Sequence, residues 1–145
     1  MLNIFESVTR RLVEVWKSDE SSGLRSSFSC RCGRPIYFQN SVCLGCQSPL
    51  GYSPSLQQLR SLTAGPTAGT WVIDEKTEQA TLWKRCKNFD SPAGCNWLVQ
   101  ADEEATLCRS CRLNHTIPNL DDPDNRLWWR KTENAKRRLV AQLLN

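Results

Sequence analysis

The residues of this chain with the clearest chemical potential are its eight cysteines, which fall into two groups of four. A tetrahedral metal site built from four thiolates needs two close pairs that a loop brings together. Each group ends in a Cys-x-x-Cys pair, and 39 residues without a cysteine separate the groups. The groups are Cys30, Cys32, Cys43 and Cys46, and then Cys86, Cys95, Cys108 and Cys111. We therefore predict two structural zinc ions, each held by four thiolates.

Other uses of these cysteines fit the sequence less well. A disulfide framework suits a small secreted domain, but residues 1–11 lack a secretion signal. Neither group has the tight spacing of a ferredoxin-like iron–sulfur site. A catalytic cysteine normally needs a histidine partner, and His115 is the only histidine. The thiols are predicted to be structural, with His115 left open as a replacement ligand.

The first group has one unusual spacing. A single residue separates Cys30 from Cys32, where a common zinc knuckle has two to four. Gly33 follows this pair and Gly45 lies inside the next one, and glycine permits the tight turns that such knuckles use. Either the first knuckle is unusually tight, or one of the two thiols is not a ligand.

The length and composition of the chain restrict its fold and exclude a membrane-spanning segment. It has 145 residues, 39% of them hydrophobic, with a formal net charge of +4 and a pI near 8.7. Two modules this small bury little apolar surface, so metal binding has to supply folding free energy. No apolar run approaches the roughly 20 residues that span a bilayer. We expect a protein of the cytoplasm, with reduced thiols, no membrane span and no evident small-molecule substrate.

The predicted fold class is small, metal-stabilised α+β. Two zinc-ribbon-like modules with short β-hairpins are flanked by an N-terminal and a C-terminal helix. The predicted divisions are an amphipathic helix and linker (1–27), the first zinc-ribbon module (28–62), a β-hairpin with the second zinc module (63–120) and a basic helix (121–145). The N-terminal helix has apolar residues at helical spacing over 3–17 and is expected to pack on the domain or on a partner.

Local patterns give further elements. Residues 36–38 are predicted to form a strand of the first module, and residues 56–62 a short helix. A hairpin is expected from strands at 71–73 and 80–86, joined by a polar turn over 74–79.

The C-terminal segment has a clear helix start. Asp122 is a good N-cap, and Pro123 fits the first helical position. The segment is basic, since six lysines and arginines between residues 126 and 138 oppose one glutamate. Apolar residues recur at helical spacing, so one face is predicted to be buried. They are Leu127, Trp128, Ala135, Leu139 and Leu143.

Four stretches of the sequence carry a resemblance to a known family. They are FSCRCGRPIYFQNSVCLGCQSPLGY (28–52), CNWLV (95–99), LCRSCRLNHTIPNL (107–120) and WWRKTENAKRRLV (128–140). Over residues 28–145 the chain resembles the N-terminal zinc-ribbon region of bacterial proteins described as zinc-binding metallopeptidases. In that family the ribbon region precedes a larger domain, in which histidines and a glutamate would hold a catalytic zinc.

The resemblance implies the accessory half of that architecture. The chain has no His-Glu-x-x-His, and a single histidine cannot supply the two imidazoles of such a site. We therefore expect no enzymatic activity from this chain. If it is a fragment of a longer protein, the helix at 123–144 would lead into the catalytic domain.

Three functions remain, and the first is binding to another protein. Six tryptophans in a small chain cannot all be deeply buried, and the adjacent Trp128 and Trp129 point to different sides of a helix. The predicted partner-binding residues are Trp128, Trp129, Arg130, Arg137 and Arg138. Nucleic-acid binding is the alternative, because zinc ribbons often serve it and the last helix is basic. The third is a fragment of a metallopeptidase.

Overall fold

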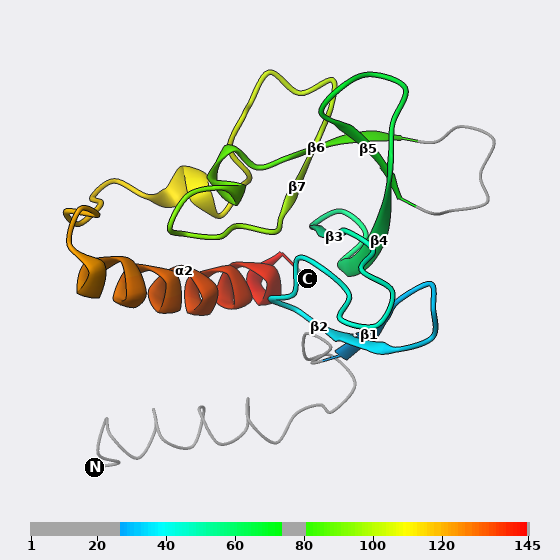
Figure 1. Cartoon of the computed structure of the whole chain (residues 1–145). Helices are drawn as coiled ribbons and strands as arrows, with labels where there is room; N and C mark the ends of the chain where they lie inside the picture. The colour runs from blue at the N-terminus through cyan, green and yellow to red at the C-terminus, as the bar shows by residue number, and fades with distance from the viewer. Residues whose placement is uncertain (1–26, 74–80, 145) are drawn as a thin grey trace, which may run out of the picture.

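A computed structural model describes residues 27–73 and 81–144 of the chain (Figure 1). The predicted N-terminal helix with its linker, and the predicted turn over 74–79, lie outside the described residues. In the part of the chain that is described, no helix combines the length and apolar character needed to cross a membrane.

Most of the β-structure is one five-stranded antiparallel sheet. Its strands follow one another in chain order, so each pairs with the next along the sequence. They are β3 (Leu50–Ser53), β4 (Gln58–Ala64), β5 (Thr70–Ile73), β6 (Leu82–Arg85) and β7 (Leu98–Gln100). Because β4 runs across residue 62, this sheet connects the predicted first module to the second.

A separate two-stranded hairpin precedes the sheet. Its strands are β1 (Ser27–Ser29) and β2 (Pro35–Tyr37), which confirms the strand predicted at residues 36–38. Gly33 closes the turn with a φ of +82°, a left-handed conformation that favours glycine. Its amide also donates to the Cys30 carbonyl at 2.9 Å. The tight Cys-x-Cys knuckle is therefore the turn of this hairpin.

Two predictions for the middle of the chain have opposite outcomes. The hairpin expected around residues 71–86 is confirmed as β5 and β6, with Trp71 opposite Trp83. The helix predicted at 56–62 is wrong, because residues 58–64 form β4. Pairing with strands on both sides satisfies the β4 backbone, and Leu59 and Leu62 are buried there. Such long-range pairing outweighs a short helical pattern in the sequence.

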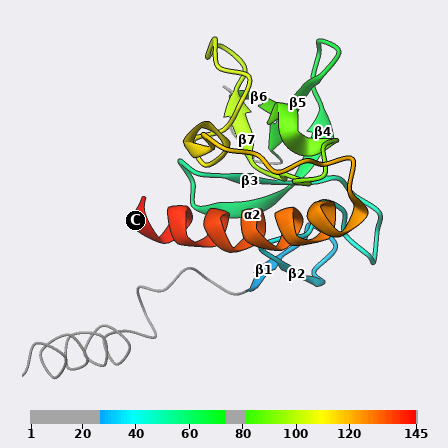
Figure 2. The ribbon, with the colours of Figure 1, turned by 90° about the vertical axis from the view of Figure 1, so that its left-hand side faces the viewer.

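The chain ends in the long helix α2 (Pro123–Leu143), as predicted. The Asp122 side chain accepts hydrogen bonds from the amides of Asp124 and Asn125, which confirms the predicted cap. Figure 2 shows α2 crossing beside the sheet, with the β1–β2 hairpin below.

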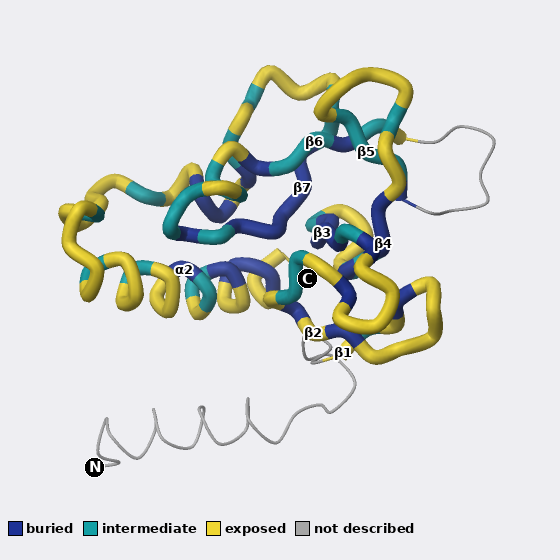
Figure 3. The backbone as a smooth tube through the Cα atoms, viewed as in Figure 1, coloured by how far each residue is buried: buried dark blue, intermediate teal, exposed yellow. Residues whose placement is uncertain are grey.

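The predicted buried face of α2 is wrong. Trp128, Leu139 and Leu143 are 62%, 55% and 75% exposed, and Leu127 and Ala135 are exposed as well. The side of α2 turned toward the sheet carries a different set, which Figure 3 shows as its dark blue part. That set is Glu133, Arg137, Val140 and Ala141. Two charged and two apolar side chains therefore face inward on this helix, while the predicted apolar row faces outward.

The larger of two buried clusters links the hairpin, the sheet and α2. The rings of Phe38, Tyr52 and Trp97 form a three-way contact, with centroids 4.8 Å apart for Phe38 and Tyr52, 5.0 Å for Tyr52 and Trp97 and 6.4 Å for Phe38 and Trp97. Val140 and Ala141 of α2 belong to the same buried cluster, as do six of the eight cysteines. The two cysteine groups are thus parts of one packed unit.

Candidate metal centres

The first cysteine cluster joins the turn of the β1–β2 hairpin to the loop before β3. Its four sulfurs all lie within 4.8 Å of one another. The Sγ atoms of Cys30 and Cys46 are 3.6 Å apart, and those of Cys32 and Cys43 are 3.7 Å apart. Both thiols of the tight pair therefore belong to the cluster, and the predicted alternative of a missing ligand is not needed. Cys30 and Cys43 are buried, whereas Cys32 and Cys46 are exposed.

The second cluster lies between β6, β7 and the loop that follows them. Cys86 comes directly after β6, Cys95 precedes β7, and Cys108 and Cys111 form the last knuckle. All four sulfurs lie within 4.8 Å of one another, and all four residues are buried. His115 is exposed and belongs to neither cluster, so it does not replace a cysteine.

The sulfur positions fit tetrahedral zinc. Zinc–sulfur bonds of about 2.3 Å at the tetrahedral angle place neighbouring sulfurs about 3.8 Å apart. The sulfur–sulfur distances of 3.6 and 3.7 Å in the first cluster and 3.7 Å between Cys95 and Cys108 agree with this. A disulfide would require about 2.05 Å, and all eight thiols are free. Four soft thiolates favour zinc over magnesium or calcium. The two clusters fit two structural zinc ions, as predicted.

Different groups surround the two sets of sulfurs. In the first cluster, the Ser61 hydroxyl lies 3.2 Å from the Cys30 sulfur. The Ser48 hydroxyl, 3.0 Å from the Cys46 sulfur, lowers the pKa of that thiol to about 6. In the second cluster, the Cys108 amide donates to the Cys86 sulfur at 3.4 Å. Such outer contacts orient the ligands and stabilise their negative charge.

The thiols of the second cluster also act on one another. A hydrogen bond from the Cys108 side chain, with help from Cys111, holds the pKa of Cys86 well below its usual range. The Cys108 contact has the opposite effect on Cys95 and raises its pKa. Sulfurs this close therefore ionise unequally unless a cation is among them. A divalent metal stabilises all four as thiolates, and its binding releases protons.

Helix α2 contacts the loops on both sides of the second cluster. The Arg137 guanidinium is 2% exposed and donates to the carbonyls of Ala93 and Gly94, just before Cys95. Glu133 is 1% exposed and accepts a hydrogen bond of 3.1 Å from Asn114, which follows Cys111. These two side chains therefore attach α2 to the loops that carry the zinc ligands.

One asparagine connects the two clusters. Asn96, next to Cys95, donates from Nδ2 to the carbonyls of Phe38 and Asn40 at 2.7 and 2.9 Å. The backbone carbonyl of Asn96 accepts a hydrogen bond from the Tyr52 amide at 2.9 Å. Residues from both modules thus share one buried hydrogen-bond network.

The predicted partner-binding residues lie on different sides of α2. Trp128, Arg130 and Arg138 are exposed, and Trp129 is half-buried. Arg137 is buried and holds the helix on the second module, so its guanidinium faces no partner. Sequence reasoning also missed Glu133, Ser48 and Ser61 as supporting groups. Their one sequence signal was polarity in small, cysteine-rich modules, which does not distinguish a buried contact from a solvated one.

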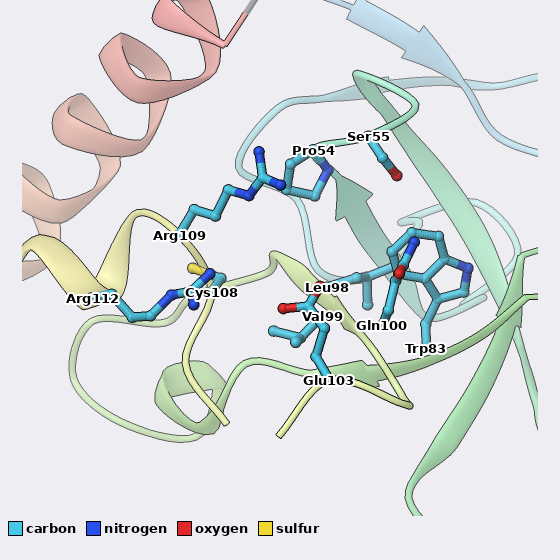
Figure 4. Close-up of a pocket in the computed structure, with 10 residues that line it drawn as sticks. All are labelled: Pro54, Ser55, Trp83, Leu98, Val99, Gln100, Glu103, Cys108, Arg109 and Arg112. Atoms are coloured by element: carbon cyan, nitrogen blue, oxygen red, sulfur yellow. The ribbon is translucent and has the colours of Figure 1, made fainter. Parts of the chain in front are cut away.

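A shallow pocket of about 90 Å³ lies beside the second cluster (Figure 4). Trp83 and Leu98 form part of its wall, and Arg109 and Arg112 lie on one side of it, next to Cys108. Pockets for small organic ligands usually measure about 300–1,000 Å³. This pocket is therefore too small to indicate a substrate site.

Comparison with known proteins agrees with the metal centres. The model of a family described as a zinc-ribbon domain matches residues 27–122. The chain is 35% identical over 117 residues to an uncharacterized protein of Mycobacterium bovis, a match that covers 80% of this chain and 30% of the relative. An uncharacterized protein of Mycobacterium tuberculosis matches with the same identity and coverage. The chain thus spans about 30% of the length of these curated relatives. No solved structure matches it significantly.

Proposed function

Since the chain belongs to the zinc-ribbon domain family, we propose that it is a non-catalytic, zinc-stabilised module that binds another protein through helix α2. Four thiolates complete the coordination of a structural zinc and leave no position for a substrate or a reactive water. The zinc ions therefore hold the scaffold, and binding is assigned to a surface that the scaffold presents.

The main support for the proposal is the row of apolar side chains that α2 exposes to solvent. A helix at the surface of a protein normally buries its apolar row. Here Trp128, Leu139 and Leu143 form an exposed row about 22 Å long, at a rise of 1.5 Å per residue. Glu133 and Arg137 hold the inner side through hydrogen bonds, and Val140 and Ala141 pack in the core on that same side. An exposed apolar row on a helix that is already anchored on its other side is typical of a docking surface.

Charge indicates the kind of partner. Lys131 and Arg138 are exposed beside the apolar row, and the Lys131 ammonium lies 4.7 Å from the Trp128 ring centroid. We assign as occupant an amphipathic helix of another protein, with an apolar row flanked by acidic side chains. A second copy of this chain fits less well, because pairing two α2 helices would bring basic side chains together.

A designed peptide tests this assignment. A helical peptide with leucines in heptad positions and flanking glutamates is titrated into the zinc-loaded protein, and affinity is measured by fluorescence anisotropy. We expect Trp128→Ala to weaken binding by about 2 kcal/mol or more, about 30-fold, as for a buried aromatic anchor. Leu44→Ala is the matched control, because Leu44 is 86% exposed but lies between Cys43 and Cys46 of the first cluster, away from α2.

Several results would contradict the assignment. Equal binding of a peptide with flanking lysines would remove the acidic partner. A dimer in analytical ultracentrifugation that Trp128→Ala dissociates would make the occupant a second copy. If the peptide binds only after residues 1–26 are deleted, the chain's own N-terminal segment covers the row.

Nucleic-acid binding is the second candidate, because the exposed side chains of α2 include Arg126, Arg130, Lys131 and Arg138. Phosphate contacts of this kind would give an affinity that falls steeply with salt. The exposed apolar row favours a protein partner instead, because contacts with phosphates would leave its leucines in water. Measuring binding to a DNA duplex at 50 and 200 mM salt separates these candidates.

The metallopeptidase resemblance gives a third candidate, in which this module is the accessory part of a longer enzyme. In that arrangement the apolar row of α2 would pack on the adjoining domain. Metal-dependent peptide hydrolysis by a protein that carries this module, absent from the module alone, would support it.

A further inference from the structure

The sulfur of each exposed cysteine in the first cluster lies beside the sulfur of a buried cysteine. Exposed Cys46 is 3.6 Å from buried Cys30, and exposed Cys32 is 3.7 Å from buried Cys43. Each pair therefore offers one sulfur to a reagent in solution and a second sulfur directly behind it. This is the arrangement that turns a first oxidation into a disulfide.

The second cluster offers no such access. All four of its cysteines are buried, and α2 contacts the loops before Cys95 and after Cys111. Cys108 lines the shallow pocket of Figure 4 but is only 2% exposed, so a small oxidant reaches these sulfurs freely only after the module opens. The two clusters thus have the same ligands but different exposure, and oxidation of cysteine follows exposure.

We propose that the first cluster is an oxidative modification site for hydrogen peroxide or a related hydroperoxide, whereas the second cluster is protected. The Cys46 thiolate attacks one peroxide oxygen, the O–O bond breaks, and hydroxide leaves, which gives a sulfenic acid. The Cys30 thiolate then attacks the Cys46 sulfur, an S–S bond forms, and a second hydroxide leaves. Two thiolates are oxidised, one peroxide is reduced, and two protons convert the hydroxides to water. Cys32 and Cys43 form an equivalent pair.

The disulfide changes the hairpin. It removes two of the four ligands of the first zinc, so this ion is released while the second stays bound. The β1–β2 turn is then joined to the loop before β3 by the disulfide alone and no longer by four zinc–sulfur bonds. Arg31, which donates from Nε to the Ser48 hydroxyl at 3.0 Å, lies next to that connection. We therefore expect the structural change to be confined to residues near the first cluster.

The test is a peroxide titration of the zinc-loaded chain. Released zinc is followed with a chromogenic chelator, and disulfides are located by peptide mass spectrometry. We expect one zinc per chain to be released at least about tenfold faster than the second, because the reaction follows thiolate exposure. Every early disulfide should lie among the cysteines between residues 30 and 46.

Histidine variants test the assigned sulfur, because zinc sites accept three cysteines and one histidine. Cys46→His should keep two zinc ions but form no Cys30 disulfide with that position, and its first zinc should leave more slowly. The matched control Leu44→Ala lies between Cys43 and Cys46 and keeps all eight cysteines, so it should leave zinc release from the first cluster unchanged. Simultaneous loss of both ions, or early oxidation between Cys86 and Cys111, would overturn the proposal. The peroxide titration of the wild-type chain tests the order of zinc release even if a variant fails to fold.

Discussion

The two cysteine clusters have the same ligands and opposite surroundings. The second is buried and covered by loops that α2 holds through Arg137 and Glu133. The first has two exposed cysteines and is supported by hydroxyl groups and a short hairpin. The same four-thiolate zinc chemistry therefore serves two structural purposes. The second metal replaces part of a hydrophobic core, whereas the first holds the β1–β2 hairpin to the loop before β3.

The largest effect is expected at the second cluster. Cys95→Ser removes a ligand that is fully buried beside Trp97, so the second zinc is lost. Structural zinc supplies on the order of 10 kcal/mol, which is comparable to the whole stability of a small domain. We expect the chain to unfold, as measured by circular dichroism and zinc content. A folded Cys95→Ser protein would show that this cluster is not a core element.

A smaller effect is expected from the equivalent change in the first cluster. Cys32→Ser should lose the first zinc but retain the second, and cost about 2–4 kcal/mol through local opening. Hydrogen exchange should increase in the β1–β2 hairpin while the sheet remains protected. Leu44→Ser, in the neighbouring knuckle, is the control and should keep both ions. Loss of protection across the whole sheet would abolish the difference between the clusters.

Next in size is the attachment of α2 to the second cluster. Arg137→Met removes the donors to the buried Ala93 and Gly94 carbonyls and should lower the free energy of unfolding by about 2–3 kcal/mol. Arg138→Met, at an exposed neighbour whose guanidinium lies over Phe38, should cost about 1 kcal/mol or less. Chemical denaturation measures both. Equal losses of unfolding free energy in the two variants would mean that the attachment of α2 does not depend on the buried Arg137.

The smallest effect on stability is expected on the outer side of α2. Trp128→Ala should change the free energy of unfolding by about 0.5 kcal/mol or less, because the side chain is 62% exposed. The same variant should lose the acidic helical peptide. A large loss of stability would instead indicate that Trp128 packs within the protein.

Much of the metal chemistry was predictable from the sequence. The spacing of the cysteines gave both clusters, because ligand pairs must be close in the chain to meet at one ion. The cap at Asp122 was also predictable, since it depends on adjacent residues. The exposure of Cys32 and Cys46 was not, because it depends on how the hairpin sits against the rest of the chain.

The errors share a physical cause. Residues 58–64 form a strand because β3 and β5 pair with them. The local sequence of the segment does not determine such pairing. The periodicity of residues 123–143 correctly predicts a helix, but the prediction that its apolar row is buried is wrong. Buried contacts of Glu133 and Arg137 with the second module decide that orientation. Their partners lie 19 and about 44 residues away in sequence.

The most direct test of the unequal clusters is a chelator titration followed by native mass spectrometry. At each step, freed cysteines are alkylated under native conditions and located by peptide mapping. We predict a one-zinc species in which only the first cluster, between Cys30 and Cys46, is alkylated. A direct transition from two ions to none, or a one-zinc species alkylated between Cys86 and Cys111, would contradict the account.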